Sequence, residues 1–159
     1  MLQQQTRAML DALNRGETLT ITPQGWSMWP TLSNKRDSVV LQKRGKRLSK
    51  GEVALFLSDA QELVLHRIVR VGGGTYDFLG DGLLVKETNI PDHRVYAVMK
   101  GFYHKSKYID ATNAAYRLYC AVWLHPPVRW FRAPLLRIGY GFIKFRNRFR
   151  KQRGGEATL

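Results

Sequence analysis

Apolar and polar residues alternate along much of the first 110 residues, and β-branched side chains are frequent in the same stretches. This pattern predicts short strands over residues 18–22, 38–42, 53–57, 62–71 and 75–79. The last two are joined by three consecutive glycines, a connection typical of a hairpin with a bulge. Short strands with short connections predict a mostly β domain over residues 18–110.

A short helix is predicted before these strands. Residues 6–14 carry apolar side chains on one helical face, and Gly16 follows as a typical end of a helix. We therefore expect residues 1–17 to form a small N-terminal segment in front of the β domain.

The C-terminal part has a helical pattern. Residues 111–125 are helix-like until two prolines interrupt them. Residues 134–150 then repeat apolar side chains at spacings of three and four, which places them on one helical face: Leu135, Ile138, Phe142, Phe145 and Phe149. We therefore expect residues 111–159 to form a helical tail.

The chain is strongly basic, and the charge is concentrated in this tail. It has 26 Lys and Arg against 12 Asp and Glu, a net charge of +14, and residues 111–155 hold ten basic residues and no acidic one. Such an excess favours an anionic partner. A basic amphipathic helix is typical of segments that lie in a membrane interface, and the expected membrane-surface residues are Arg137, Lys144, Arg146, Arg148 and Arg150. A helix that packs on the β domain with a solvated basic side is the alternative.

Several classes of protein are not indicated. Residues 1–16 lack the apolar stretch of a secretory signal, and no window reaches the roughly 18 apolar residues of a spanning helix. The single cysteine, Cys120, cannot form an internal disulfide. His93, His104 and His125 lack the spacing of metal ligands. We expect a cytoplasmic or peripheral membrane location and no cofactor.

Ser27 is the first candidate for chemistry. It lies between Gly25 and Pro30, in a segment that can be neither a regular helix nor a central strand. Such a bend can expose a hydroxyl together with backbone N–H groups. A serine becomes a nucleophile when a base removes its proton, and N–H donors then hold the oxyanion. From these residues alone, an ordinary loop serine is the simpler interpretation.

The sequence around Ser27, Gly-Trp-Ser-Met-Trp-Pro-Thr-Leu, resembles the nucleophile box Ser-Met-x-Pro-Thr of the type I signal peptidase and LexA-like serine peptidases. Similar segments follow in the same order: residues 50–56 (Lys-Gly-Glu-Val-Ala-Leu-Phe), 65–69 (Leu-His-Arg-Ile-Val), 80–82 (Gly-Asp-Gly) and 95–101 (Val-Tyr-Ala-Val-Met-Lys-Gly). The similarity covers about residues 18–103 and implies the β fold of that group, with short strands and hairpins.

The resemblance implies Ser27 as nucleophile and His66 as general base. His66 follows 39 residues after Ser27, within a His-Arg-Ile stretch similar to that of the histidine-type enzymes of the endoplasmic reticulum and archaea. Histidine suits this role because its ordinary pKa, about 6.5, leaves it mostly neutral at pH 7. A strand histidine satisfied by backbone groups is the alternative.

The third catalytic residue is open. Asp81 matches the first family aspartate and is the preferred partner that orients the histidine. The second family aspartate has no clean match, and Glu87 is the possible substitute. Gly25 replaces the serine that many members carry two residues before the nucleophile, so the second oxyanion donor is also open. The neighbours of the nucleophile are expected to bind substrate, with ordinary packing as the alternative: Trp26, Met28 and Trp29.

The expected activity is that of a serine endopeptidase that removes signal or leader segments from protein or peptide substrates. Conventional signal peptidases carry a spanning helix before the serine, and this chain has none, so we expect a specialised peptidase with few substrates. A catalytically inactive relative that binds peptides is one alternative. A nucleic-acid-binding protein that uses the basic tail is another, although the tail has no recognisable binding motif.

Overall fold

The computed structural model describes the backbone of residues 2–6 and the whole of residues 7–45, 47–125 and 134. The chain divides into two compact units, Met1–Val122 and Trp123–Leu159. The expected membrane-surface residues Arg137, Lys144, Arg146, Arg148 and Arg150 lie outside the described residues. Within the described ranges, no helix combines the length and the apolar character needed to cross a bilayer.

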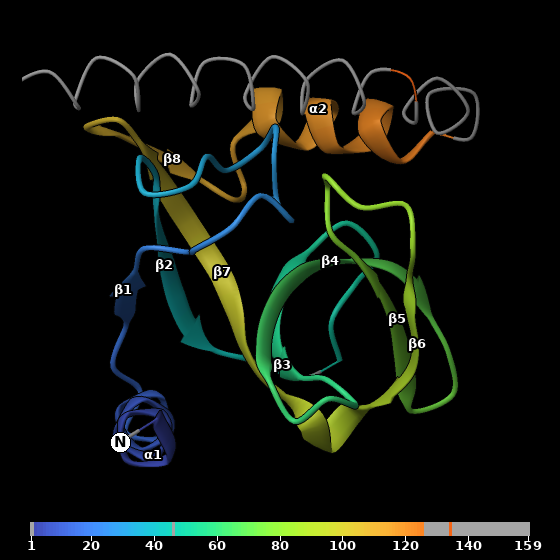
Figure 1. Ribbon diagram of the computed structural model, residues 1–159. Helices are drawn as coiled ribbons and strands as arrows, with labels where there is room; N and C mark the ends of the chain where they lie inside the picture. Colours follow the sequence, from blue (N-terminus) through green and yellow to red (C-terminus); the bar gives the residue numbers. More distant parts are fainter. Residues whose placement is uncertain (1, 46, 126–133, 135–159) are drawn as a thin grey trace, which may run out of the picture. The chain divides into compact units, whose positions relative to one another are not determined.

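The first unit is built on one antiparallel sheet, which confirms the prediction of a mostly β protein (Figure 1). The described residues form eight strands: β1 (Leu19–Ile21), β2 (Ser38–Lys43), β3 (Val53–Leu57), β4 (Leu63–Val71), β5 (Thr75–Leu79), β6 (Glu87–Pro91), β7 (Val95–His104) and β8 (Lys107–Asp110). Their order is β1-β2-β7-β3-β4-β5-β6, and β8 pairs with the end of β7. A short 3₁₀ helix, η1 (Asp92–Arg94), joins β6 to β7.

The strands that the alternating pattern predicts are present. β3 and β5 have the expected bounds, β2 and β4 differ from them by one residue at one end, and β1 is one residue shorter at each end. The pattern does not predict β6 and β8, because each is short and they have few fully buried side chains, one in β6 and none in β8. β6 buries only Ile90 fully, and its Asn89 has a positive φ of 58°. Such strands form because a neighbouring strand supplies hydrogen bonds, not because of their own apolar pattern.

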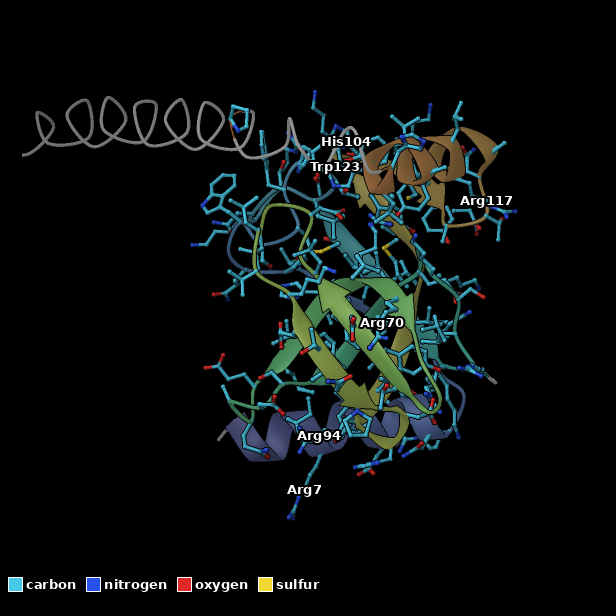
Figure 2. The ribbon with its side chains drawn as sticks, turned by 90° about the vertical axis from the view of Figure 1, so that its right-hand side faces the viewer. Arg7, Arg70, Arg94, His104, Arg117 and Trp123 are labelled. Atoms are coloured by element: carbon cyan, nitrogen blue, oxygen red, sulfur yellow. The ribbon has the colours of Figure 1, made fainter. Side chains whose placement is uncertain are left out.

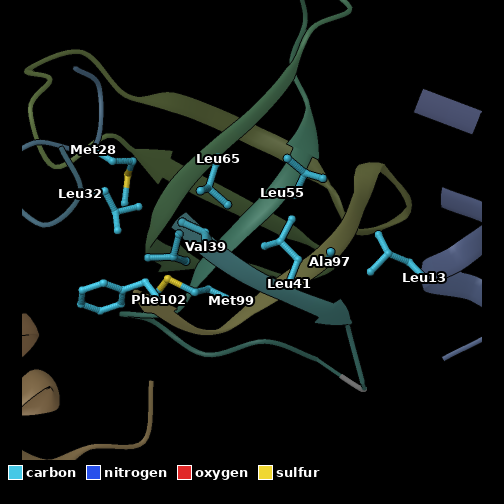
Figure 3. Packing of buried hydrophobic residues seen from close by; sticks show 11 residues of the cluster. Leu13, Met28, Leu32, Val39, Leu41, Leu55, Leu65, Ala97, Met99 and Phe102 are labelled. Atoms are coloured by element: carbon cyan, nitrogen blue, oxygen red, sulfur yellow. The ribbon is translucent and has the colours of Figure 1, made fainter. Parts of the chain in front are cut away.

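The core lies on both faces of β3. Val53 and Leu55 join one apolar cluster, while Ala54 and Phe56 join a second, as the period of two in a strand requires. The first cluster includes side chains from the helix, strands and loops that surround it (Figure 3): Leu13, Met28, Leu32, Val39, Leu41, Leu65, Ala97, Met99 and Phe102. Because β3 is buried on both faces, it is a rigid support for the side chains of the neighbouring strand β4.

The described residues also form two α-helices besides the sheet. α1 (Leu2–Asn14) begins earlier than predicted and ends as expected before Gly16, whose φ of 85° suits a glycine after a helix. α2 (Ala114–Leu124) lies within the predicted helical stretch. Asn113 starts it, because its side-chain oxygen accepts a hydrogen bond from the backbone N–H of Tyr116 at 3.2 Å.

Candidate functional site

Ser27 lies in a tight turn that precedes β2. The N–H of Trp29 donates to the carbonyl of Trp26 at 3.0 Å, and that of Leu32 donates to the carbonyl of Met28 at 2.9 Å. Met28 and Leu32 are buried in the first core cluster and anchor both ends of the turn. Ser27 itself is half-buried. The two backbone hydrogen bonds and the buried side chains of Met28 and Leu32 therefore fix the backbone beside the hydroxyl.

Gly25 allows the chain to enter this turn. Its φ of 89° is in the region that favours glycine, and its N–H donates to the side-chain oxygen of Asn34 at 3.1 Å. This N–H is therefore occupied in the structure. Asn34 lines the same cavity as Ser27.

His66 is carried by β4, which pairs with the doubly buried β3. It stands opposite Ala54 and is only 5% exposed. Its ring lies 6.1 Å from that of Phe56. The side chain is thus held in one orientation by the strand and by packing.

Ser27 and His66 meet at Gly80. A methyl group on Gly80 would stand 2.5 Å from the carbonyl oxygen of Ser27 and 3.0 Å from Nε2 of His66. The N–H of Gly82 donates to that same carbonyl at 2.8 Å and fastens the two loops together. Within the described part of the chain no hydrogen bond joins the Ser27 hydroxyl to His66. In ligand-free enzymes such bonds are often long and tighten only with substrate.

Glu87 is the residue that orients His66. Its Oε1 lies 3.0 Å from Nδ1 of His66, and its side chain is 30% exposed. An ionised carboxylate only accepts hydrogen bonds, so the proton of a neutral imidazole is on Nδ1 and Nε2 carries the lone pair. Nε2 is the atom beside Gly80, so the basic nitrogen points towards the Ser27 loop.

The electrostatics keep His66 neutral. Burial lowers the pKa of His66 to about 4, although the negative charge of Asp81 opposes this shift. Burial also raises the pKa of Glu87, and the nearby charge of Asp59 adds to that effect. At neutral pH the imidazole is therefore an unprotonated base.

Asp81, the preferred third residue in the sequence analysis, has another partner. It is 1% exposed and forms a two-point ion pair with Arg67, whose Nε and Nη2 lie 2.8 and 2.6 Å from its oxygens. The hydroxyl of Thr31 donates to it as well. His66 and Arg67 are consecutive in β4, so their side chains leave on opposite faces. Asp81 therefore pairs with Arg67, and Glu87 takes the place beside His66.

The Arg67–Asp81 pair connects the site to α2. Nη1 of Arg67 lies 3.2 Å from the hydroxyl of Tyr116 and 3.0 Å from Sγ of Cys120, and the Tyr119 hydroxyl lies 3.0 Å from that of Thr31. Burial tends to lower the pKa of Arg67, but the attraction of Asp81 outweighs it and raises that pKa, so the guanidinium group is charged. A loop of the candidate site and a helix are thus held by one buried network.

A cavity of about 660 Å³ unites the candidate residues. Ser27, His66, Glu87 and Met28 all line it. Apolar side chains from five different segments form much of its wall: Ile21, Leu32, Leu55, Leu63, Leu65 and Leu83. A space of this size and character suits a short stretch of peptide.

The structure separates the other predicted residues from this cavity. Trp26 and Trp29 are half-buried and are not among the described residues that line it. Sequence reasoning did not single out the turn between β3 and β4, where Ser58, Asp59 and Glu62 reach the cavity, because nothing in its pattern marks a site. In the described ranges no three His, Cys, Asp or Glu side chains are grouped to hold a metal ion.

No protein-family model, no curated protein and no solved structure matches the chain.

Proposed function

We propose that this protein is a serine endopeptidase with Ser27 as nucleophile and His66 as general base. The observation that carries the proposal is that the backbone carbonyl of Ser27 and Nε2 of His66 both lie beside Gly80, that both residues line one cavity, and that a carboxylate lies on Nδ1. A neutral imidazole with its lone pair on Nε2 can take the proton of a serine hydroxyl.

The proposed reaction uses these residues as follows. Substrate in the cavity brings its carbonyl carbon to the Ser27 oxygen, His66 removes the hydroxyl proton, and an acyl-enzyme forms as the peptide bond breaks. Protonated His66 then gives its proton to the leaving amine. Glu87 stabilises the imidazolium and keeps it oriented. Water releases the acyl group in the second half of the cycle.

The substrate class is a signal or leader segment of a protein or peptide. Support comes from the resemblance of residues 25–32, 65–69 and 80–82 to the signal-peptidase and LexA-like group, and from the apolar wall of the cavity. The same resemblance is the basis for proposing the β fold of that group for this sheet.

Digestion of a proteome-derived peptide library tests the proposal. The full chain is expected to create new N-termini that are absent with Ser27→Ala and present with Ser33→Ala, which removes another hydroxyl from the wall of the same cavity. If wild-type protein cuts nothing, or if Ser27→Ala cuts as well as wild type, the proposal is wrong. An inactive peptide-binding relative would give the first of these results.

A further inference from the structure

The cavity is acidic, although the chain around it is strongly basic. Asp59, Glu62 and Glu87 line it, and no Lys or Arg is among the described residues of its wall. The chain as a whole has a net charge of +14. Figure 2 shows arginines that project from other parts of the first unit, among them Arg7 on α1 and Arg70 on β4. A cavity of opposite sign on such a protein concentrates a cationic ligand at one place.

The carboxylates are close to one another and to the reacting groups. Glu87 bonds Nδ1 of His66 at 3.0 Å, and Asp59 is near enough to Glu87 to raise its pKa. Arg94 offsets part of the charge of Asp59, at 2.7 Å. Glu62 has no ion pair with any described side chain and reaches the cavity from the same turn as Asp59.

A second observation also indicates a ligand at this place. His66 lines the cavity, and while its Nδ1 is held by Glu87, its Nε2 has no hydrogen-bond partner among the described residues. Nε2 is not one of the fully buried atoms that lack a partner, so it is accessible to solvent and can accept a hydrogen bond from a bound molecule. The apolar wall then receives the rest of that molecule. A peptide with one cationic side chain fits both features better than a metal ion, because no described group of side chains has the arrangement of metal ligands.

Building on the function proposed above, we infer that the cavity selects peptides that carry a lysine or arginine close to the cleaved bond. The cationic side chain lies between Glu62 and the Asp59–Glu87 pair, and apolar residues of the peptide contact the leucines of the wall. The positive charge relieves the repulsion between the acidic groups. The ammonium or guanidinium group contacts carboxylates and not the imidazole of His66.

Binding to the full-length Ser27→Ala variant tests the inference without any need for cleavage. The probes are fluorescent decapeptides of alanine and leucine in which one position is lysine, norleucine or glutamate, moved along the sequence. Norleucine keeps the length of the lysine side chain without its charge. At the best position, lysine is expected to bind about fivefold more tightly than norleucine, and glutamate more weakly than both.

Variants that remove a single negative charge show which carboxylate produces the preference for lysine. Glu62→Gln, added to Ser27→Ala, is expected to remove most of the lysine preference, whereas Glu17→Gln changes an exposed acid outside the cavity and is expected to keep it. Equal affinities for lysine and norleucine, no binding of any peptide, or a preference that survives Glu62→Gln would overturn the inference. A lysine preference in binding together with no cleavage by wild type would instead reject the peptidase function and leave the cationic site standing.

Discussion

At the scale of single residues, the candidate site depends on groups that keep the imidazole of His66 neutral and hold it in one orientation. Burial by β3 and β4 lowers the pKa of His66, and Glu87 accepts from Nδ1, so the lone pair is on the nitrogen beside Gly80. Gly80 is essential to this arrangement because its missing side chain is the space in which the Ser27 loop and the imidazole approach each other.

Gly80→Ala is therefore expected to abolish activity. The added methyl group would stand 2.5 Å from the Ser27 carbonyl oxygen, and backbone atoms cannot move aside as cheaply as a flexible side chain. We expect a fall in kcat/KM of about 10²-fold or more, as for other small misplacements of catalytic groups. Gly73→Ala is the matched control, because a methyl group there meets nothing within 4 Å. Equal activity of the two variants would contradict this geometry.

His66 also predicts how stability responds to acid. Its pKa in the folded chain, about 4, lies below the unfolded value of about 6.5. The unfolded chain thus takes up a proton first, so this contribution to stability is complete above about pH 6.5 and is lost as the pH falls towards 4. The loss is on the order of 3 kcal/mol.

Thermal unfolding of wild type and His66→Gln at pH 7 and pH 4.5 measures this effect. Wild type is expected to lose more stability than the variant between these two conditions, because only wild type has the buried imidazole. The acid limb of kcat/KM should also lie well below pH 6.5. The same pH dependence of stability in both proteins would show that His66 is not buried as a neutral group.

At the scale of elements, two consecutive residues of β4 point their side chains to opposite faces and contact different partners. His66 faces the cavity and Glu87, while Arg67 faces Asp81 and the side chains of α2. The Gly80–Asp81–Gly82 segment contacts residues on both faces of β4. The N–H of Gly82 donates to the Ser27 carbonyl, and the carboxylate of Asp81 pairs with Arg67. The loop that contacts Ser27 is thus fixed by an ion pair on the other side of the strand.

Asp81→Asn and Glu87→Gln are expected to separate structure from catalysis. Asp81→Asn leaves the buried charge of Arg67 without its carboxylate, which typically costs about 3–5 kcal/mol, and hydrogen exchange in α2 should increase. Glu87→Gln removes a half-exposed carboxylate with little loss of stability. Its amide can donate to Nδ1 and favour the wrong tautomer, so kcat should fall by up to about 10⁴-fold. If Asp81→Asn were stable but inactive and Glu87→Gln were fully active, Asp81 and not Glu87 would be the residue that orients His66.

Much of this organisation can be predicted from the sequence, and the rest follows from tertiary contacts. The strand pattern predicts β1 to β5, and the motifs identify Ser27, His66 and their neighbours. The pairing of Glu87 with His66 is not predictable in the same way, because it depends on β6, an exposed strand that pairs with β5. The motif favours Asp81 as the partner of His66. It does not reveal that Arg67 points to the opposite face of β4 from His66 and pairs with Asp81 there.

At the scale of the whole molecule, the distribution of charge determines which partners we expect the protein to bind. The acidic cavity and the basic chain favour different partners, and residues 111–155, with ten Lys and Arg and no Asp or Glu, carry most of the net charge of +14. We propose that this tail brings the protein to an anionic membrane surface, where leader segments of substrates would also gather. The proposal rests on the sequence pattern of residues 134–150.

Flotation with lipid vesicles tests this role. The full chain is expected to float with vesicles that contain anionic phospholipid and to stay behind with neutral ones, because each basic residue near such a surface contributes about 1 kcal/mol. Glutamine at Arg137, Lys144, Arg146, Arg148 and Arg150 should abolish flotation. The control makes the same charge change at five exposed cations of the first unit: Arg7, Lys35, Lys43, Lys50 and Lys100. Equal losses in the two variants would indicate a general charge effect and not a membrane-binding tail.

The central claim is that Ser27 and His66 act as one catalytic unit, and a double-mutant cycle on a cleaved peptide tests it most directly. Residues of one unit are not additive, so Ser27→Ala, His66→Ala and the double variant are all expected to lower kcat by a similar factor, about 10⁴–10⁶. Near-wild-type cleavage by either single variant, or a double variant whose loss is the product of the two single losses, would contradict the account.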